Sequence, residues 1–66
     1  MQVTVIYGLK KEDVRLKPGA VIADAIAALA ANPQTIIIKL NGKIAHEKAK
    51  LSEGDKVELI GIIYGG

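Results

Sequence analysis

The first apolar positions of the chain alternate with polar ones, as they do in β-strands. Residues 2–7 (QVTVIY) are rich in β-branched side chains and predict a strand. Residues 8–11 (GLKK) are typical of a turn, and residues 12–16 (EDVRL) alternate more weakly. Together these segments predict an N-terminal β-hairpin, which ends at Lys17-Pro18-Gly19.

The next segment has helical periodicity. Ile22, Ile26 and Leu29 recur at i, i+4 and i+7 and predict a helix over residues 21–31 (VIADAIAALAA), which its alanines favour. No Ser, Thr, Asp or Asn directly precedes this segment, so its N-cap is weak. Asn32-Pro33 ends the pattern.

Further strands follow the helix. Residues 35–40 (TIIIKL) predict a central strand, and Asn41-Gly42 is the best short hairpin signal in the chain. A short returning strand is therefore expected over residues 43–45. After a polar segment that ends in a turn at residues 52–55, residues 56–64 (KVELIGIIY) predict the last strand.

The order β-β-α-β-β-β predicts an α+β fold in which one helix packs across a mixed sheet of four to five strands. This order resembles the β-grasp (ubiquitin-like) roll, and residues 1–66 are expected to form a single domain. The predicted core contains Val3, Val5, Val14, Leu16, Ile22, Ile26, Leu29, Ile36, Ile38, Leu40, Leu51, Val57 and Leu59.

Alternation also predicts an apolar outer face of the sheet. Side chains that directly follow core residues in a strand point away from the core. Exposed aliphatic patches usually mark interaction sites, although such residues can also lie scattered or beneath loops. The predicted docking patch for a partner consists of Ile6, Ile37, Ile60 and Ile62.

Composition restricts the chemistry of the chain. It has no cysteine and one histidine, His46, which we expect in a solvated loop, so neither a disulfide nor a metal site is expected. The net charge of +2 and the absence of a basic stripe argue against a nucleic-acid partner. The longest apolar run is too short to span a bilayer and no signal peptide is visible, which predicts a cytoplasmic protein without a membrane partner. The lysines expected to form a solvated face, or to steer the chain toward an acidic partner, are Lys10, Lys11, Lys17 and Lys43.

The sequence ends in Gly65-Gly66. A backbone without side chains can enter a channel that a side chain would block. Two residues reach at most about 7 Å, so Ile63 and Tyr64 are expected to leave the sheet with them, which gives a flexible tail over residues 63–66. This pattern points to the carboxyl group of Gly66 as the reactive group.

Four motifs are distributed along the chain: Leu16-Lys17-Pro18-Gly19 before a helix with Asp24, Asn41-Gly42 after an aliphatic strand, Glu53-Gly54-Asp55-Lys56-Val57-Glu58, and Gly65-Gly66. Together they resemble the ThiS/MoaD sulfur-carrier family over the whole chain. Gly61-Ile62-Ile63-Tyr64 stands where molybdenum-cofactor carriers often place prolines, and this difference favours the ThiS branch or an archaeal relative.

The resemblance implies that an E1-like adenylating enzyme (ThiF/MoeB-like) uses ATP and Mg to activate Gly66 as an acyl adenylate. Sulfur then replaces AMP to give a thiocarboxylate. A sulfur-accepting synthase, such as thiazole synthase or the large subunit of molybdopterin synthase, would consume it to make the thiazole of thiamine or the molybdenum cofactor, and tRNA thiolation is a third destination. The chain itself has no phosphate-binding loop and no catalytic side-chain set, so we expect a protein cosubstrate that binds no cofactor, and not an enzyme.

Two other functions fit the same pattern. A ubiquitin-like modifier would be conjugated to lysines through Gly66, as in some archaeal relatives. A TGS-like module would bind nucleotide or RNA and would not need Gly65-Gly66.

Overall fold

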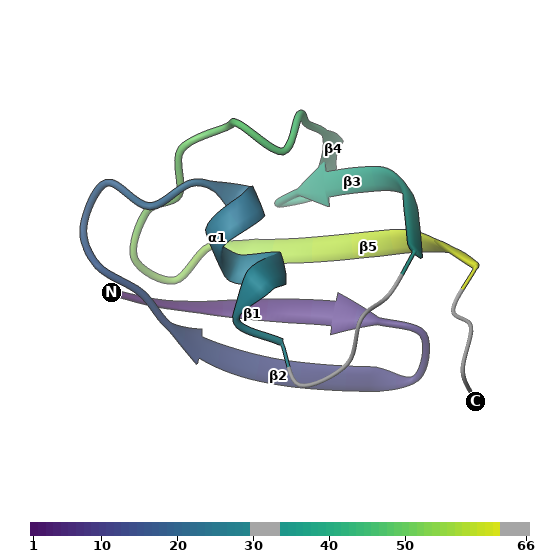
Figure 1. The fold of residues 1–66 in the computed structure, drawn as a ribbon, viewed down its shortest axis with the longest axis horizontal. Coiled ribbons are helices and arrows are strands. Elements are labelled where there is room, and N and C mark those ends of the chain that lie inside the picture. The colour runs from purple at the N-terminus through teal and green to yellow at the C-terminus, as the bar shows by residue number, and fades with distance from the viewer. Residues whose placement is uncertain (30–33, 63–66) are drawn as a thin grey trace.

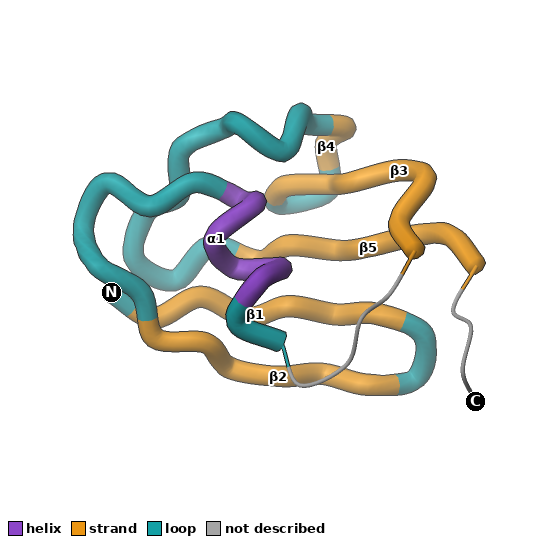
Figure 2. The backbone as a smooth tube through the Cα atoms, viewed as in Figure 1, coloured by secondary structure: helices purple, strands orange, loops and turns teal. Residues whose placement is uncertain are grey.

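The chain folds into a mixed five-stranded sheet with one short helix across one face (Figure 1). The computed structural model describes residues 1–29 and 34–62. This architecture confirms the predicted β-grasp α+β fold and its element order. In chain order the elements are β1 (Gln2–Tyr7), β2 (Lys10–Arg15), α1 (Ile22–Ala27), β3 (Gln34–Leu40), β4 (Lys43–Ile44) and β5 (Lys56–Ile62). Figure 2 shows the strands in orange and the helix in purple.

The first and last strands lie side by side at the centre of the sheet. The strand order is β2-β1-β5-β3-β4. β1 and β5 run parallel, with Val5 opposite Val57, whereas the other neighbouring strands are antiparallel. Along both strands, side chains therefore point alternately toward the helix and toward solvent.

Two tight turns set the hairpin registers. Gly8 and Leu9 alone join β1 to β2, and Gly8 has a φ of 59°. The predicted turn over residues 8–11 was therefore too long, and β2 begins at Lys10. Asn41 and Gly42 have φ values of 52° and 87°, the pattern of a type I′ turn, which confirms the second predicted hairpin.

The predicted helix over residues 21–31 was too long, because α1 ends at Ala27. The Ala28 N–H bonds the carbonyls of both Asp24 and Ala25 at 3.2 Å, and the Leu29 N–H bonds the Ile26 carbonyl at 3.1 Å. Three-residue spacing tightens a last turn and stops an α-helix. Residues 30–31 of that prediction lie outside the described residues.

Backbone from the loop after β4 supports the start of α1. The Ile22 N–H donates to the Ala49 carbonyl at 3.0 Å, and the Ala23 N–H donates to the Glu47 carbonyl at 2.9 Å. The Asp24 carboxylate accepts the Val21 N–H at 2.9 Å. The first N–H groups of a helix need such partners, so α1 is held in place although the local sequence gives it a weak cap.

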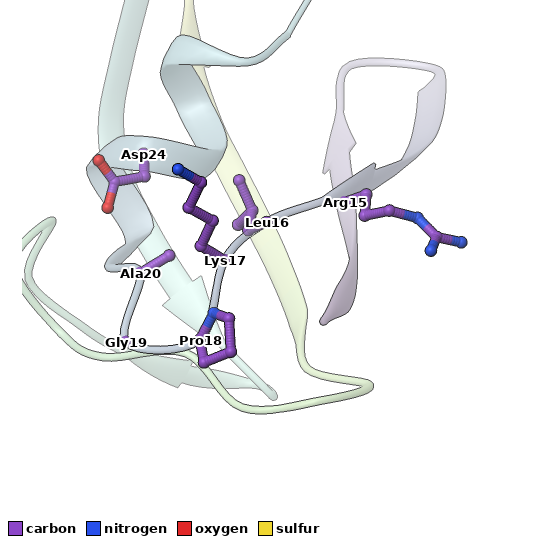
Figure 3. Close-up of a pocket in the computed structure, with 7 residues that line it drawn as sticks. All are labelled: Arg15, Leu16, Lys17, Pro18, Gly19, Ala20 and Asp24. Atoms are coloured by element: carbon purple, nitrogen blue, oxygen red, sulfur yellow. The ribbon is translucent and has the colours of Figure 1, made fainter.

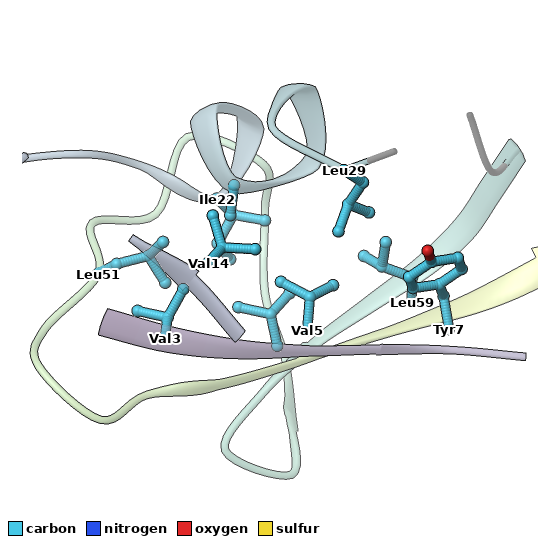
Figure 4. Close-up of a cluster of buried hydrophobic side chains, with 10 residues drawn as sticks. Val3, Val5, Tyr7, Val14, Ile22, Leu29, Leu51 and Leu59 are labelled. Atoms are coloured by element: carbon cyan, nitrogen blue, oxygen red, sulfur yellow. The ribbon is translucent and has the colours of Figure 1, made fainter. Parts of the chain in front are cut away.

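The core lies between α1 and the inner face of the sheet (Figure 4). Tyr7 and Ala25 belong to it although neither was predicted, and Ala25 lets the helix approach the strands closely. Four predicted core residues are only partly buried and pack against the edge of this core. A six-residue helix cannot cover the whole inner face of the sheet, which leaves Ile38 and Leu40 on β3 partly open, whereas Leu16 follows β2 and Ile26 lies on α1 itself. The side chain of Ile36 lies outside the described part. The other predicted core residues are confirmed: Val3, Val5, Val14, Ile22, Leu29, Leu51, Val57 and Leu59.

The centre of this core gives a stability test. Ile22 is 0% exposed, so Ile22→Val is expected to lower the free energy of unfolding by about 0.5–1.5 kcal/mol. Ile44 is 77% exposed and provides the matched control, because Ile44→Val should change the free energy by less than about 0.5 kcal/mol. Urea denaturation measures both. Equal shifts of the two midpoints would contradict the placement of Ile22.

Candidate functional site

The carboxyl-terminal end of β5 lies beside the β1–β2 turn. Tyr7, the last residue of β1, pairs with Leu59, and β5 continues from there to Ile62. The end of β5 and the turn therefore share one end of the sheet (Figure 1). The predicted tail over residues 63–66 lies outside the described residues, and with it the positions of Tyr64, Gly65 and Gly66.

The outer face of the sheet at this end carries aliphatic side chains. Ile60 pairs directly with Ile37 across β5 and β3, and these side chains are 38% and 39% exposed. Ile6 is half-buried on the neighbouring strand, opposite Glu58. Three of the four residues of the predicted patch therefore lie on one face, and the side chain of Ile62 is outside the described part.

Charged residues border this aliphatic group. Glu58 lies between Ile6 on β1 and Lys39 on β3, and Lys11 of β2 pairs with Ile6 from the other side. A small apolar centre with a charged rim is typical of protein interfaces. We name Ile6, Ile37 and Ile60 the outer patch.

Two exposed aliphatic side chains were missed by sequence reasoning. Leu9 is 107% exposed at the β1–β2 turn, and Ile44 is 77% exposed on β4. Leu9 is one of the two residues of the β1–β2 turn, and it also lay within the predicted turn over residues 8–11, but its exposure was not inferred from that prediction. Ile44 is exposed because β4 is a short edge strand, which pairs only with Lys39 and Leu40 of β3.

Tyr7 joins the two strands of the N-terminal hairpin from the inner face. Its side chain is 2% exposed, and its hydroxyl donates a hydrogen bond to the Glu12 carboxylate. This bond raises the pKa of Tyr7 above its usual value of about 10, and burial and the negative charge of Glu12 act in the same direction. The bond ties β2 to β1 within the hairpin, and β1 in turn pairs with β5 through Tyr7 and Leu59.

A shallow pocket lies at the opposite end of the sheet, where β2 leads into α1. It is lined by Arg15, Asp24 and the segment 16–20 (Figure 3). Asp24 uses its carboxylate to hold the Val21 N–H, and Gly19 supplies a φ of 90°. The motif that begins at Leu16 therefore shapes the chain entry into the helix, far from the end of β5.

The other two internal motifs form one hydrogen-bonded pair of turns. The Asn41 amide donates to Asp55 Oδ1 at 3.0 Å, and Asn41 Oδ1 accepts the Lys56 N–H at 2.9 Å. The second carboxylate oxygen of Asp55 accepts the Ser52 N–H at 2.7 Å. These bonds explain both motifs by turn geometry, as the sequence predicted.

The remaining polar residues are dispersed. His46 is exposed in the loop after β4 and accepts the Lys48 N–H on Nδ1 at 3.1 Å. In residues 1–29 and 34–62, no group of three or more His, Cys, Asp or Glu side chains could hold a metal ion. No helix in the same ranges is long and apolar enough to cross a membrane. The lysines predicted to form one solvated face are exposed but lie in three separate places, namely the β1–β2 hairpin (Lys10, Lys11), the segment before α1 (Lys17) and β4 (Lys43).

A mixed five-stranded β-grasp sheet with a central last strand and one helix across its inner face defines a small ubiquitin-like domain. The model of the ThiS family matches residues 2–66. The chain therefore belongs to the ThiS family, whose members are small sulfur carriers and not enzymes. Such carriers interact with E1-like adenylating enzymes and with sulfur-accepting enzymes.

The Tyr7–Glu12 bond predicts a decline of stability at alkaline pH. Because the pKa of Tyr7 is higher in the folded state than in the unfolded chain, its contribution is complete below about pH 10 and is lost as pH rises toward the folded-state pKa. Tyr7→Phe should flatten this part of the curve of unfolding free energy against pH. Tyr64→Phe is the matched control for tyrosine ionisation in general. Parallel alkaline curves for wild type and Tyr7→Phe would contradict the assignment.

Proposed function

We propose that this chain carries sulfur as a thiocarboxylate on Gly66. The observation that supports the proposal most directly is the family match, which extends through Gly66. The position of β5 adds to it, because the strand that leads toward Gly66 is anchored at the centre of the sheet by β1 and β3. Because β5 is held within the sheet, a partner can bind the folded domain while it acts on the residues that follow β5.

The proposed chemistry has two steps. The Gly66 carboxylate attacks the α-phosphorus of Mg-bound ATP, which forms an acyl adenylate and releases pyrophosphate. A sulfur nucleophile equivalent to hydrosulfide then attacks the carbonyl carbon, and AMP leaves. Both steps need phosphate-binding and charge-stabilising groups, and in the proposal the adenylating enzyme supplies them, together with ATP and Mg.

The outer patch is the proposed contact with that enzyme. Ile37 and Ile60 lie on the solvent side of β3 and β5, whereas the inner face of β5 holds the core residues Val57 and Leu59. The two faces therefore have separate roles, so the outer face can be changed without removing core contacts. A sulfur-accepting synthase would use the same carrier after sulfur transfer.

Adenylation is tested with the cognate E1-like enzyme, ATP and Mg. Wild type is expected to support exchange of pyrophosphate into ATP, and deletion of Gly66 is expected to abolish it while the circular dichroism spectrum stays unchanged. With a sulfur donor present, intact mass should increase by the replacement of one oxygen by sulfur. Failure of wild type to release any pyrophosphate would contradict the proposal, and high-mass adducts on lysines would show conjugation in its place.

The outer patch is tested separately. Ile60→Ala should raise the Kd for the adenylating enzyme about tenfold, since exposed apolar anchors at interfaces commonly contribute 1–2 kcal/mol. Ile60→Val is the matched control, because it keeps a branched apolar side chain in the strand. Titration calorimetry measures both Kd values. Equal Kd values for wild type and Ile60→Ala would remove Ile60 from the interface.

A further inference from the structure

Leu9, at the tip of the β1–β2 hairpin, points into solvent and adds no buried apolar area to the core. Leu9 is 107% exposed, and the demand of the turn for a positive φ falls on Gly8 and not on Leu9. Small polar residues usually occupy such turns. One exposed leucine is ordinary on a protein surface, so its surroundings decide whether it has a role.

The hairpin holds Leu9 in a defined place beside the end of β5. Six consecutive residue pairs join β1 to β2, from Gln2–Arg15 to Tyr7–Lys10. Since Tyr7 also pairs with Leu59, the turn that follows Tyr7 lies alongside the last residues of β5 (Figure 1). A partner that receives the carboxyl-terminal end of β5 therefore meets this tip as well.

Positive charge surrounds the leucine. Lys10 and Lys11 follow it directly, and both are exposed. The next acidic residues of the hairpin are already engaged: Glu12 accepts a hydrogen bond from Tyr7, and Asp13 accepts one from the Thr4 hydroxyl at 2.9 Å. These bonds hold the two carboxylates against β1 while they keep their charge, and the exposed ammonium groups of Lys10 and Lys11 are accessible to an acidic surface.

The tip is also continuous with the outer patch. Lys11 pairs with Ile6, which belongs to that patch. We propose that Leu9, Lys10 and Lys11 form a docking tip that enters an apolar pocket rimmed by carboxylates on the adenylating enzyme. This proposal rests on the proposed function, which supplies the partner. With the outer patch as a second contact, the tip fixes the rotation of the carrier on the enzyme surface.

Titration calorimetry of the full chain with the cognate adenylating enzyme, without ATP, tests the apolar contact. Leu9→Ser should raise the Kd about tenfold. Leu9→Met keeps the apolar bulk and should bind like wild type. Because Leu9 is fully exposed, both variants should unfold at the same urea concentration as wild type. Unchanged binding by Leu9→Ser would overturn the proposal.

Charge reversal tests the acidic rim. The double variant Lys10→Glu/Lys11→Glu should weaken binding, and the effect should shrink as salt is added, because exposed charges are screened. Lys48→Glu/Lys50→Glu makes the same charge change on two exposed lysines of the loop after β4 and should leave the Kd unchanged. An equal rise in Kd for both double variants would overturn the proposal that Lys10 and Lys11 meet carboxylates on the enzyme. A wild type that binds through Leu9 but releases no pyrophosphate would contradict adenylation alone, whereas a wild type that does not bind would overturn the docking tip.

Discussion

The parallel pairing of the first and last strands is the contact on which the rest of this small domain depends. It places Val5 beside Val57 at the centre of the core, where both are fully buried. Parallel neighbours cannot be joined by a tight turn, so all other elements lie in the connection between β1 and β5. Of these, β2 forms one edge of the sheet, β3 and β4 form the other side, and α1 covers the inner face. The same pairing brings the end of β5 to the β1–β2 turn.

The sheet separates stability from recognition. Its inner face meets a helix of only six residues, whose first N–H groups are completed by carbonyls from the loop after β4. A chain of 66 residues has little apolar area with which to build a core, yet Ile37, Ile60 and Leu9 remain in contact with solvent in the described structure. Such exposure lowers the apolar area buried in the core, and an aliphatic group with a charged rim has the composition typical of protein interfaces.

Local rules predicted most of the fold, and the failures lie where distant residues decide. Alternation and turn chemistry are properties of neighbouring residues, so the strands, the Asn41-Gly42 turn and most of the core were predictable. The length of α1 was not predictable from local rules. It depends on the tight hydrogen-bonded turn after Ala27 and on the carbonyls of Glu47 and Ala49, which lie in a distant loop. The burial of Tyr7 followed the alternation of Val3 and Val5, but its bond to Glu12 depends on the hairpin register. Of the predicted patch, Ile6, Ile37 and Ile60 share a face because β3, β5 and β1 are neighbours, a relation that no single segment contains.

The internal motifs that resemble the family all have structural duties. The Asp24 carboxylate accepts the Val21 N–H at the start of α1. The Asn41 side chain donates to Asp55 and accepts the Lys56 N–H, which joins the two turns. A polar side chain committed to the backbone in this way stabilises a shape and is not available to a substrate. The resemblance therefore separates into two parts: the interior motifs specify the β-grasp frame, and only the terminal glycine pair enters the chemistry that we propose. A carrier built in this manner is recognised by its surface, so its specificity must be sought in exposed residues that the frame does not require.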